Sequence, residues 1–218
     1  MKMKKLLITS ILTLSSITVS NAAIILNGDF ETGAADNFNT NPATGVPNWL
    51  WDGLENAPTR NVNGDYGGGT DRFALGRGVE SANGFGAIYQ TTGEIIGAGT
   101  SYSMTAVAFN TFNQHDGELI ARLYYLDGAT RTYIAGAEDT YVGLVPEEYT
   151  TPGSLQIDYT GSGAAVGNPL GVEFSWENGT GNGSWQAVDN VAINIVPEPS
   201  SAVLLGLGGL ALMLRRRK

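Results

Sequence analysis

ELIARLYYL, residues 118–126, is followed by Asp127-Gly128 and then by TRTYIA, residues 130–135. Both stretches are rich in the β-branched, aliphatic and aromatic residues that favour strands. Asp-Gly between two such stretches is a hairpin signal, because the central residues of the favoured two-residue turn need positive φ. The segment therefore predicts two adjacent antiparallel strands.

The same pattern continues on both sides of this hairpin. In Ser101–Asn110 the alternate residues Tyr102, Met104 and Ala106 are apolar, as on a strand with one buried face. Residues 186–195 also alternate, and this predicts a strand that is buried on one face and wet on the other. Further strands are expected at residues 23–26, 85–90, 154–159 and 170–176.

The remaining composition also favours a β protein. Glycine accounts for 30 of the 218 residues, and no stretch between the two ends keeps an apolar period of 3.6 residues. Residues 30–85 are rich in loop-forming residues, and no strand can be assigned there. About eight to ten short strands without helical crossovers predict an all-β fold, an antiparallel β-sandwich of the jelly-roll type.

The N-terminus has the three parts of a secretory signal peptide. Lys2, Lys4 and Lys5 precede an apolar run from Leu6 to about Val19, and the run is followed by Ser20-Asn21-Ala22. The alternative is a transmembrane anchor, but about 14 apolar residues are too few to span a membrane comfortably. We expect residues 1–22 to form a signal helix that the Sec translocon engages and signal peptidase removes.

Charge limits the partners of the body, residues 23–196. It contains five arginines, no lysine and 20 acidic residues, which give a formal charge of −15. Such a surface repels phosphate backbones and anionic headgroups, so nucleic acid binding is excluded. Neutral polymers and divalent cations are the compatible partners.

The residue types that many active sites need are scarce. The chain has no cysteine and one histidine, His115, which excludes thiol chemistry and histidine-based or cysteine-based zinc sites. Glu147-Glu148 and Glu138-Asp139 are adjacent pairs, and neighbours on a strand point to opposite faces, so neither forms a natural catalytic dyad. There is no G-x-S-x-G motif. We therefore expect a protein that is not an enzyme.

The two ends of the body carry a matching pair of motifs, LNGDFE at residues 26–31 and VDNV at residues 188–191. This combination resembles the galactose-binding-like jelly rolls found in many carbohydrate-binding modules, which open with N-G-D/N-F-E and close with a D-N/D-V strand. Pro47 and Trp49, about twenty residues into the body, fit as well. The resemblance covers residues 25–195 and implies a glycan-binding sandwich.

The same resemblance implies a structural Ca²⁺ ion where the first and last strands meet. Glu31 and Asp189 would supply carboxylates, and backbone oxygens near Asn27 and Asp29 would complete the shell of six to eight oxygens that Ca²⁺ prefers. A cation would also stabilise an acidic domain that has no disulfide. The alternative is that Asn27 and Asp29 form a turn while Asp189 bonds locally.

Aromatic residues are the candidates for sugar contacts. Trp49 and Trp51 are two residues apart and would share one face of a strand. They are our candidate ligand-binding residues, since an indole ring can stack on a pyranose. The alternative is that they fill the core, where aromatic side chains contribute most burial.

The C-terminal 23 residues read VPEPSSAVLLGLGGLALMLRRRK. They resemble the PEP-CTERM sorting signal of exported bacterial proteins, which has a Pro-Glu-Pro junction, a short apolar helix and a basic end. The matching junction and terminal residues are Pro197, Glu198, Pro199, Arg215, Arg216 and Arg217. The resemblance implies recognition by an exosortase, removal of residues 197–218, and delivery to the outer surface or the extracellular matrix.

The length of the tail agrees with transient use. About 14 apolar residues make a helix of roughly 21 Å, which is shorter than a hydrocarbon core of about 30 Å. The basic end would stay on the cytoplasmic side of the inner membrane. Together these features predict an exported, non-catalytic surface or matrix protein that binds a polysaccharide. The alternatives are a purely structural or adhesive component and a polysaccharide-active enzyme.

Overall fold

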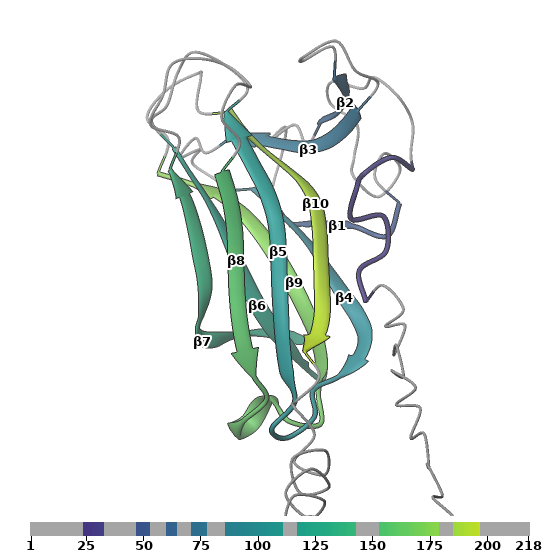
Figure 1. Cartoon of the computed structure of the whole chain (residues 1–218), viewed down its shortest axis with the longest axis vertical. Coiled ribbons are helices and arrows are strands. Elements are labelled where there is room, and N and C mark those ends of the chain that lie inside the picture. Colours follow the sequence, from purple (N-terminus) through teal and green to yellow (C-terminus); the bar gives the residue numbers. More distant parts are fainter. Residues whose placement is uncertain are drawn as a thin grey trace, which may run out of the picture.

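The computed structural model describes residues 24–32, 47–52, 60–64, 71–77, 86–110, 117–142, 153–178 and 185–196. Within these residues, ten strands form two five-stranded antiparallel sheets that pack face to face (Figure 1). This arrangement confirms the predicted all-β sandwich. The helices expected for residues 1–22 and 197–218 lie outside the described residues.

Sheet A has the strand order β1-β4-β9-β6-β7, and sheet B has the order β2-β3-β10-β5-β8. The strands of sheet A are β1 (Leu50–Asp52), β4 (Ala87–Ile95), β9 (Pro169–Glu177), β6 (Glu118–Asp127) and β7 (Thr130–Val142). Those of sheet B are β2 (Arg60–Gly64), β3 (Asp71–Arg77), β10 (Trp185–Val196), β5 (Ser101–Asn110) and β8 (Gly153–Thr160). One 3₁₀ turn, η1 (Gly163–Ala165), precedes β9.

The hairpin predicted at residues 118–135 is β6–β7, with Asp127 opposite Thr130 and Gly128 at a φ of +61°. Five other strands, β4, β5, β8, β9 and β10, lie where alternation or apolar runs predict them, within a few residues. The strand predicted at residues 23–26 is wrong. Residues 24–27 form bends instead. β1, β2 and β3 fall in the stretch where no strand could be assigned.

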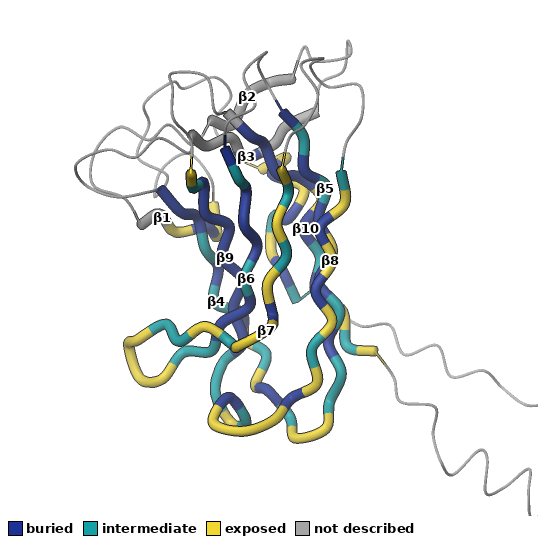
Figure 2. The backbone as a smooth tube through the Cα atoms, turned by 90° about the vertical axis from the view of Figure 1, so that its left-hand side faces the viewer, coloured by how far each residue is buried: buried dark blue, intermediate teal, exposed yellow. Residues whose placement is uncertain are grey.

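The core lies between the sheets. On β9 the residues Leu170, Val172, Phe174 and Trp176 point inward, and each is fully buried. The intervening residues of β9 belong to the opposite face of sheet A, yet this face is also largely buried at β9. Figure 2 shows the dark tubes of the central strands between lighter edges. Something must therefore cover the outer face of sheet A.

The N-terminal strap, residues 24–32, closes one side of the sandwich. Ile25 enters the core. The side-chain amide of Gln90 donates to the carbonyl of Leu26 at 2.9 Å and accepts from its backbone N–H at 2.8 Å, as a neighbouring strand would. The N–H of Val191 on β10 donates to the carbonyl of Gly28 at 2.8 Å. The strap is thus tied to both sheets.

Candidate functional site

The outer face of sheet A carries an alternating set of polar and aromatic residues. Because successive residues of a strand point to opposite faces, the residues between the core positions of β9 share this face with their cross-strand partners. The set includes Tyr89 and Thr91 on β4, Gly171, Glu173, Ser175 and Glu177 on β9, Glu118, Arg122 and Tyr124 on β6, and Arg131, Tyr133, Glu138 and Thr140 on β7.

A bulge in β7 turns the tip of the β6–β7 hairpin outward. Arg122 pairs with Glu138 and Tyr124 pairs with Tyr133, so four residues of β7, 134–137, lie opposite Leu123 alone. Gly136 within the bulge has a φ of +75°, a conformation that favours glycine. Figure 2 shows the tip projecting away from the sandwich below the outer face of sheet A. The tip therefore forms a wall beside that face.

Arg131 on this tip reaches across the sheet. Its guanidinium donates to Glu173 at 2.6 Å and lies 3.8 Å from the ring centroid of Tyr89, which belongs to the strand beyond β9. The hydroxyl of Tyr133 donates to the other oxygen of Glu173 at 2.6 Å. Arg131 and Tyr133 cover Glu173, which is only 2% exposed. This cover explains why β9 is buried on both faces. A buried carboxylate needs such partners.

A second arginine extends this network toward Glu177. Arg122 donates to Glu177 at 2.7 Å and to Ser175 Oγ at 2.6 Å, and lies 5.5 Å from the ring centroid of Tyr133. Burial opposes ionisation of Glu177, but the hydrogen bonds from Arg122 and Ser175 outweigh it and lower the pKa of Glu177. Burial also acts against the charge of Arg122, yet Glu177 raises the pKa of Arg122 overall. Both groups are therefore held in their charged forms.

Tyr124 forms the floor of this face. It is fully buried, and its hydroxyl is 2.8 Å from that of Thr91. A Cβ on Gly171 would lie 2.2 Å from its ring, so glycine is required beneath it. Burial raises the pKa of Tyr124 to about 12, and burial together with the bond to Glu173 raises the pKa of Tyr133 to about 12. Both hydroxyls therefore stay protonated, and that of Tyr133 donates to Glu173.

The ion pair of Arg122 and Glu177 should make stability depend on acid. Because the folded pKa of Glu177 is lowered, its stabilisation is present above the unfolded pKa, near 4.5, and is lost as the pH falls through the folded value. We expect Glu177→Gln to lower the stability at pH 7 by about 0.5–1 kcal/mol and to have no effect at strongly acidic pH. Thermal melts across this range measure the difference.

Glu138→Gln is the matched control for that experiment. Glu138 also contacts Arg122, at 3.4 Å, but its side chain is 61% exposed. Solvent screens such a contact, so we expect little change at any pH. An equal acid dependence in both variants would contradict the role given to Glu177.

A sugar contact by Trp49 requires this residue to lie at the surface, and the structure places it in the core. It is 1% exposed, and its ring lies 5.2 Å from that of Phe30 and 6.0 Å from that of Phe174. Its indole N–H donates to the carbonyl of Asn27 at 3.0 Å. Trp49 therefore fills the core, as the alternative interpretation predicts. Trp51 of β1 pairs with Ile88 of β4, and its side chain lies outside the described part of the structure.

The predicted calcium ligands lie on the strap and on β10. Asn27 is committed to local bonds, since its side chain contacts the backbone of Thr32 and Pro47 and its carbonyl accepts from Phe30 and Trp49. Asn27 therefore does not fit as a ligand, and it forms the turn considered as the alternative.

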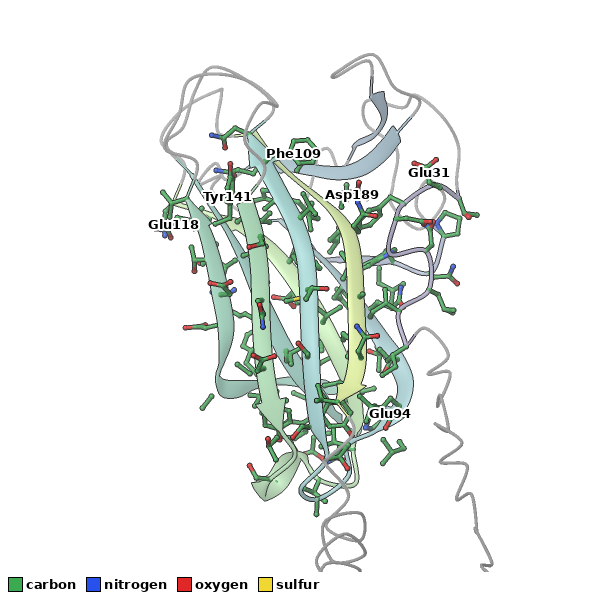
Figure 3. The ribbon with its side chains drawn as sticks, viewed as in Figure 1. Glu31, Glu94, Phe109, Glu118, Tyr141 and Asp189 are labelled. Atoms are coloured by element: carbon green, nitrogen blue, oxygen red, sulfur yellow. The ribbon has the colours of Figure 1, made fainter. Side chains whose placement is uncertain are left out.

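Asp29, Glu31 and Asp189 have carboxylates near the same end of the sandwich. Asp29 accepts from the N–H of Glu31 at 3.4 Å, and both residues are exposed. Asp189 is 6% exposed and accepts two bonds from Asn190 at the bulge of β10. Figure 3 labels Asp189 on β10 and Glu31 on the neighbouring strap. Among the described residues, no three acidic or histidine side chains cluster as a metal site.

Sequence reasoning missed the residues of the outer face, because each was interpreted only as part of a strand. One signal was present. VEFSWE, residues 172–177, places Glu173, Ser175 and Glu177 at alternate positions within an otherwise apolar strand. Such alternation predicts a polar face, but it does not reveal the arginines that arrive from the hairpin. The adjacent pair Glu138-Asp139 does diverge as predicted, toward Arg122 and toward the N–H of Gln156.

Comparison with known families identifies the tail. The family described as the PEP-CTERM protein-sorting motif matches residues 196–218, which include Pro197, Glu198, Pro199, Arg215, Arg216 and Arg217. Of the matched residues, the structure describes only Val196. The motif implies an exported protein that is held transiently in the membrane before release. Within the described residues, no helix has the length and apolar character of a membrane span. No curated protein sequence matches the chain.

Solved structures resemble the body. A cyclase from Fischerella sp. TAU in complex with 4-(1H-indol-3-yl)butan-2-one has a TM-score of 0.58 and 18% identity, over 82% of this chain and 100% of the cyclase. TmCBM61 in complex with β-1,4-galactotriose has a TM-score of 0.45 and 13% identity, over 80% of this chain and 99% of that one. Family 16 Carbohydrate Binding Module-2 has a TM-score of 0.43 and 16% identity, over 78% of this chain and 99% of the module.

At this identity, the likeness to the cyclase shows the fold alone, and the two modules score below 0.5. The strand order and the cyclase agree on a two-sheet antiparallel sandwich. The chain carries a PEP-CTERM protein-sorting motif behind a jelly-roll β-sandwich body.

Proposed function

We propose that this protein is an exported, non-catalytic surface or matrix component that binds a neutral polysaccharide at the outer face of sheet A. The observation that carries the proposal is the reach of Arg131 across the sheet to Glu173 and Tyr89. It gathers charged and aromatic side chains from four strands into one fixed arrangement. Removal of residues 197–218 by an exosortase would release the body from the inner membrane.

The chemistry of this face suits a glycan. Sugar hydroxyls need both donors and acceptors, and the part-exposed side chains of Arg122, Arg131 and Glu177 provide them in an ordered network. The apolar faces of sugar rings need exposed aromatic or aliphatic surface. Tyr133 is 51% exposed, and Leu50, which pairs with Tyr89 on the same sheet, is also 51% exposed. The body charge of −15 favours a neutral polymer over an anionic one.

The carboxylates on this face support binding rather than hydrolysis. Glu118 is the cross-strand partner of Glu177, but its carboxylate is hydrogen-bonded to the side chain of Asn178. Glu173 and Glu177 lie four residues apart on one strand, about 13 Å along the backbone, whereas glycosidases hold their two carboxyl groups roughly 5–10 Å apart. Each is also paired with an arginine. The polysaccharide-active enzyme considered from the sequence therefore has less support than a binding protein.

Binding of the secreted protein to a panel of neutral glycans, including the producer's own exopolysaccharide, tests the proposal. The mass of the same sample shows whether residues 197–218 have been removed. We expect Tyr133→Ala to weaken glycan binding by about tenfold or more, since it removes the most exposed aromatic ring of the face.

Tyr159→Ala is the matched control, because Tyr159 is a partly exposed tyrosine of β8 on the other sheet. It should bind like the wild type. Absence of binding to every glycan would overturn the proposal and leave a purely structural or adhesive component. Equal losses in both variants would remove the outer face of sheet A as the binding site.

We also propose a structural Ca²⁺ ion bound by Glu31 and Asp189, which would join the strap to β10. The support is the contact between Gly28 and Val191, which brings the two segments together beside these residues. Chelator should lower the melting temperature of the wild type, and calcium should restore it. Glu31→Ala should melt like the chelated protein with or without calcium. An unchanged melting temperature in both experiments would remove calcium from the account.

A further inference from the structure

Two loops without a charged residue lie at the end of the sandwich where β10 stops, next to the tip of the β6–β7 hairpin, which carries Asp127 and Arg131. The loops are IIGAGT, residues 95–100, and GSGAAVGN, residues 161–168, which includes η1. We call these two loops the end platform. In a body with a charge of −15, a surface of 14 residues without a charge is a distinct feature. Figure 3 places the nearest labelled carboxylate, Glu94, at the rim of this end.

The end platform is well ordered because its two loops bond to each other. The N–H of Ile96 donates to Asn168 at 3.0 Å, and that of Gly167 donates back to Ile96 at 2.9 Å. Gly99 and Gly161 add a bond of 2.9 Å. A Cβ on Gly161 would lie 2.0 Å from the carbonyl of Gly97, so the close approach of the loops needs glycine there. The platform is therefore a fixed surface.

The sorting tail leaves the body beside this platform. Val196, the last residue of β10, pairs with Ser101, the residue at which the loop of residues 95–100 enters β5, so the tail starts beside that loop. Ser101 pairs on its other side with Thr160, which precedes the second loop. Figure 1 shows β10 ending at the same end of the sandwich. Residues 197–201 separate it from the apolar segment and can span at most about 18 Å. An inserted tail would hold the platform close to the bilayer.

We propose that the end platform lies against the lipid headgroups of the inner membrane while the tail is inserted. An acidic body is repelled by anionic headgroups, and the uncharged platform is the part that can approach them at least cost. Two exposed apolar side chains on this end, Ile95 at 52% and Val196 at 45%, fit an interfacial position. The platform would thus set the orientation in which the Pro-Glu-Pro junction meets the processing enzyme.

The absence of native cysteine allows a direct test with single-cysteine variants of the full chain. Ala98→Cys and Ala164→Cys place a fluorescent label on exposed sites of the platform, and Ser154→Cys places it at the opposite end of β8. The proteins are reconstituted in vesicles of phosphatidylethanolamine and phosphatidylglycerol that carry a headgroup-attached quencher. We expect several-fold stronger quenching of the two platform labels than of the Ser154 label.

Charge changes give a second readout in the same vesicles. Ala98→Glu should reduce the quenching of the Ala164→Cys label, and Ala98→Lys should increase it. Equal quenching at all three label positions, or no effect of the charge changes, would overturn the proposal, as would failure of the chain to float with the vesicles. Quenching that requires an added exosortase would assign the platform to that enzyme instead of the lipid. None of these outcomes depends on glycan binding.

Discussion

Arg131→Ala should lower the free energy of unfolding by about 3 kcal/mol, or roughly 6–12 °C in Tm. The substitution leaves the carboxylate of Glu173, which is 2% exposed, without its ionic partner. The hydroxyl of Tyr133 still donates to this carboxylate. We therefore expect a loss of stability at the lower end of the range for breaking a buried ion pair. Thermal or urea unfolding of the secreted protein gives the value.

The double variant Arg131→Met, Glu173→Met separates stability from binding. It removes both charges together, so no uncompensated charge is buried, and we expect stability within about 1 kcal/mol of the wild type. If the outer face of sheet A binds a glycan, this stable variant should nevertheless lose the binding. A double variant as unstable as Arg131→Ala would show that the loss comes from packing rather than from charge.

Arg131→Lys distinguishes the two contacts of this side chain. Lysine retains a positive charge for Glu173 but has no planar group to stack on Tyr89. We therefore expect stability between those of the wild type and Arg131→Ala, with weakened glycan binding. Wild-type behaviour in both assays would mean that the stacking on Tyr89 has no role.

The sequence predicts most of the strands because alternation and turn chemistry are local properties. β5 begins and ends where the alternation of SYSMTAVAFN does, and Gly128, at a φ of +61°, begins the two-residue turn between Asp127 and Thr130. β2 and β3 lack this signal. RNVNG in β2 is polar and contains asparagine and glycine, so it forms a strand only because it pairs with β3. Tertiary pairing of this kind cannot be seen in a single segment.

The candidate site was beyond prediction for a related reason. Arg131 and Tyr133 come from a hairpin tip, and only the bulge at residues 134–137 carries that tip beside β9 and β4. A bulge of this size leaves a weak signal, one glycine at residue 136 within TYIAGAEDT. The motif pair at residues 26–31 and 188–191 did predict contact between the strap and β10, and the bond from Val191 to Gly28 is consistent with it.

Trp49→Ala should lower the free energy of unfolding by about 3–5 kcal/mol, the range for removing a large aromatic side chain from a core. Trp49 contacts the rings of both Phe30 and Phe174, so its loss opens a cavity between the strap and sheet A. The turn at Asn27 also loses the indole N–H that donates to its carbonyl. Calorimetry or chemical unfolding measures the change.

Trp49→Phe tests which interpretation of this residue is right. Phenylalanine retains most of the ring contacts and loses the hydrogen bond to Asn27, so we expect a smaller loss of about 1–2 kcal/mol. Because Trp49 lies on the core side of sheet A and the proposed glycan site lies on the other side, glycan affinity at a temperature where the variant is folded should equal that of the wild type. A variant that keeps the wild-type melting temperature but no longer binds glycan would show the opposite, that the indole contacts the ligand. Trp49 is only 1% exposed and packs between the strap and the core, so we expect the variant to keep its glycan affinity.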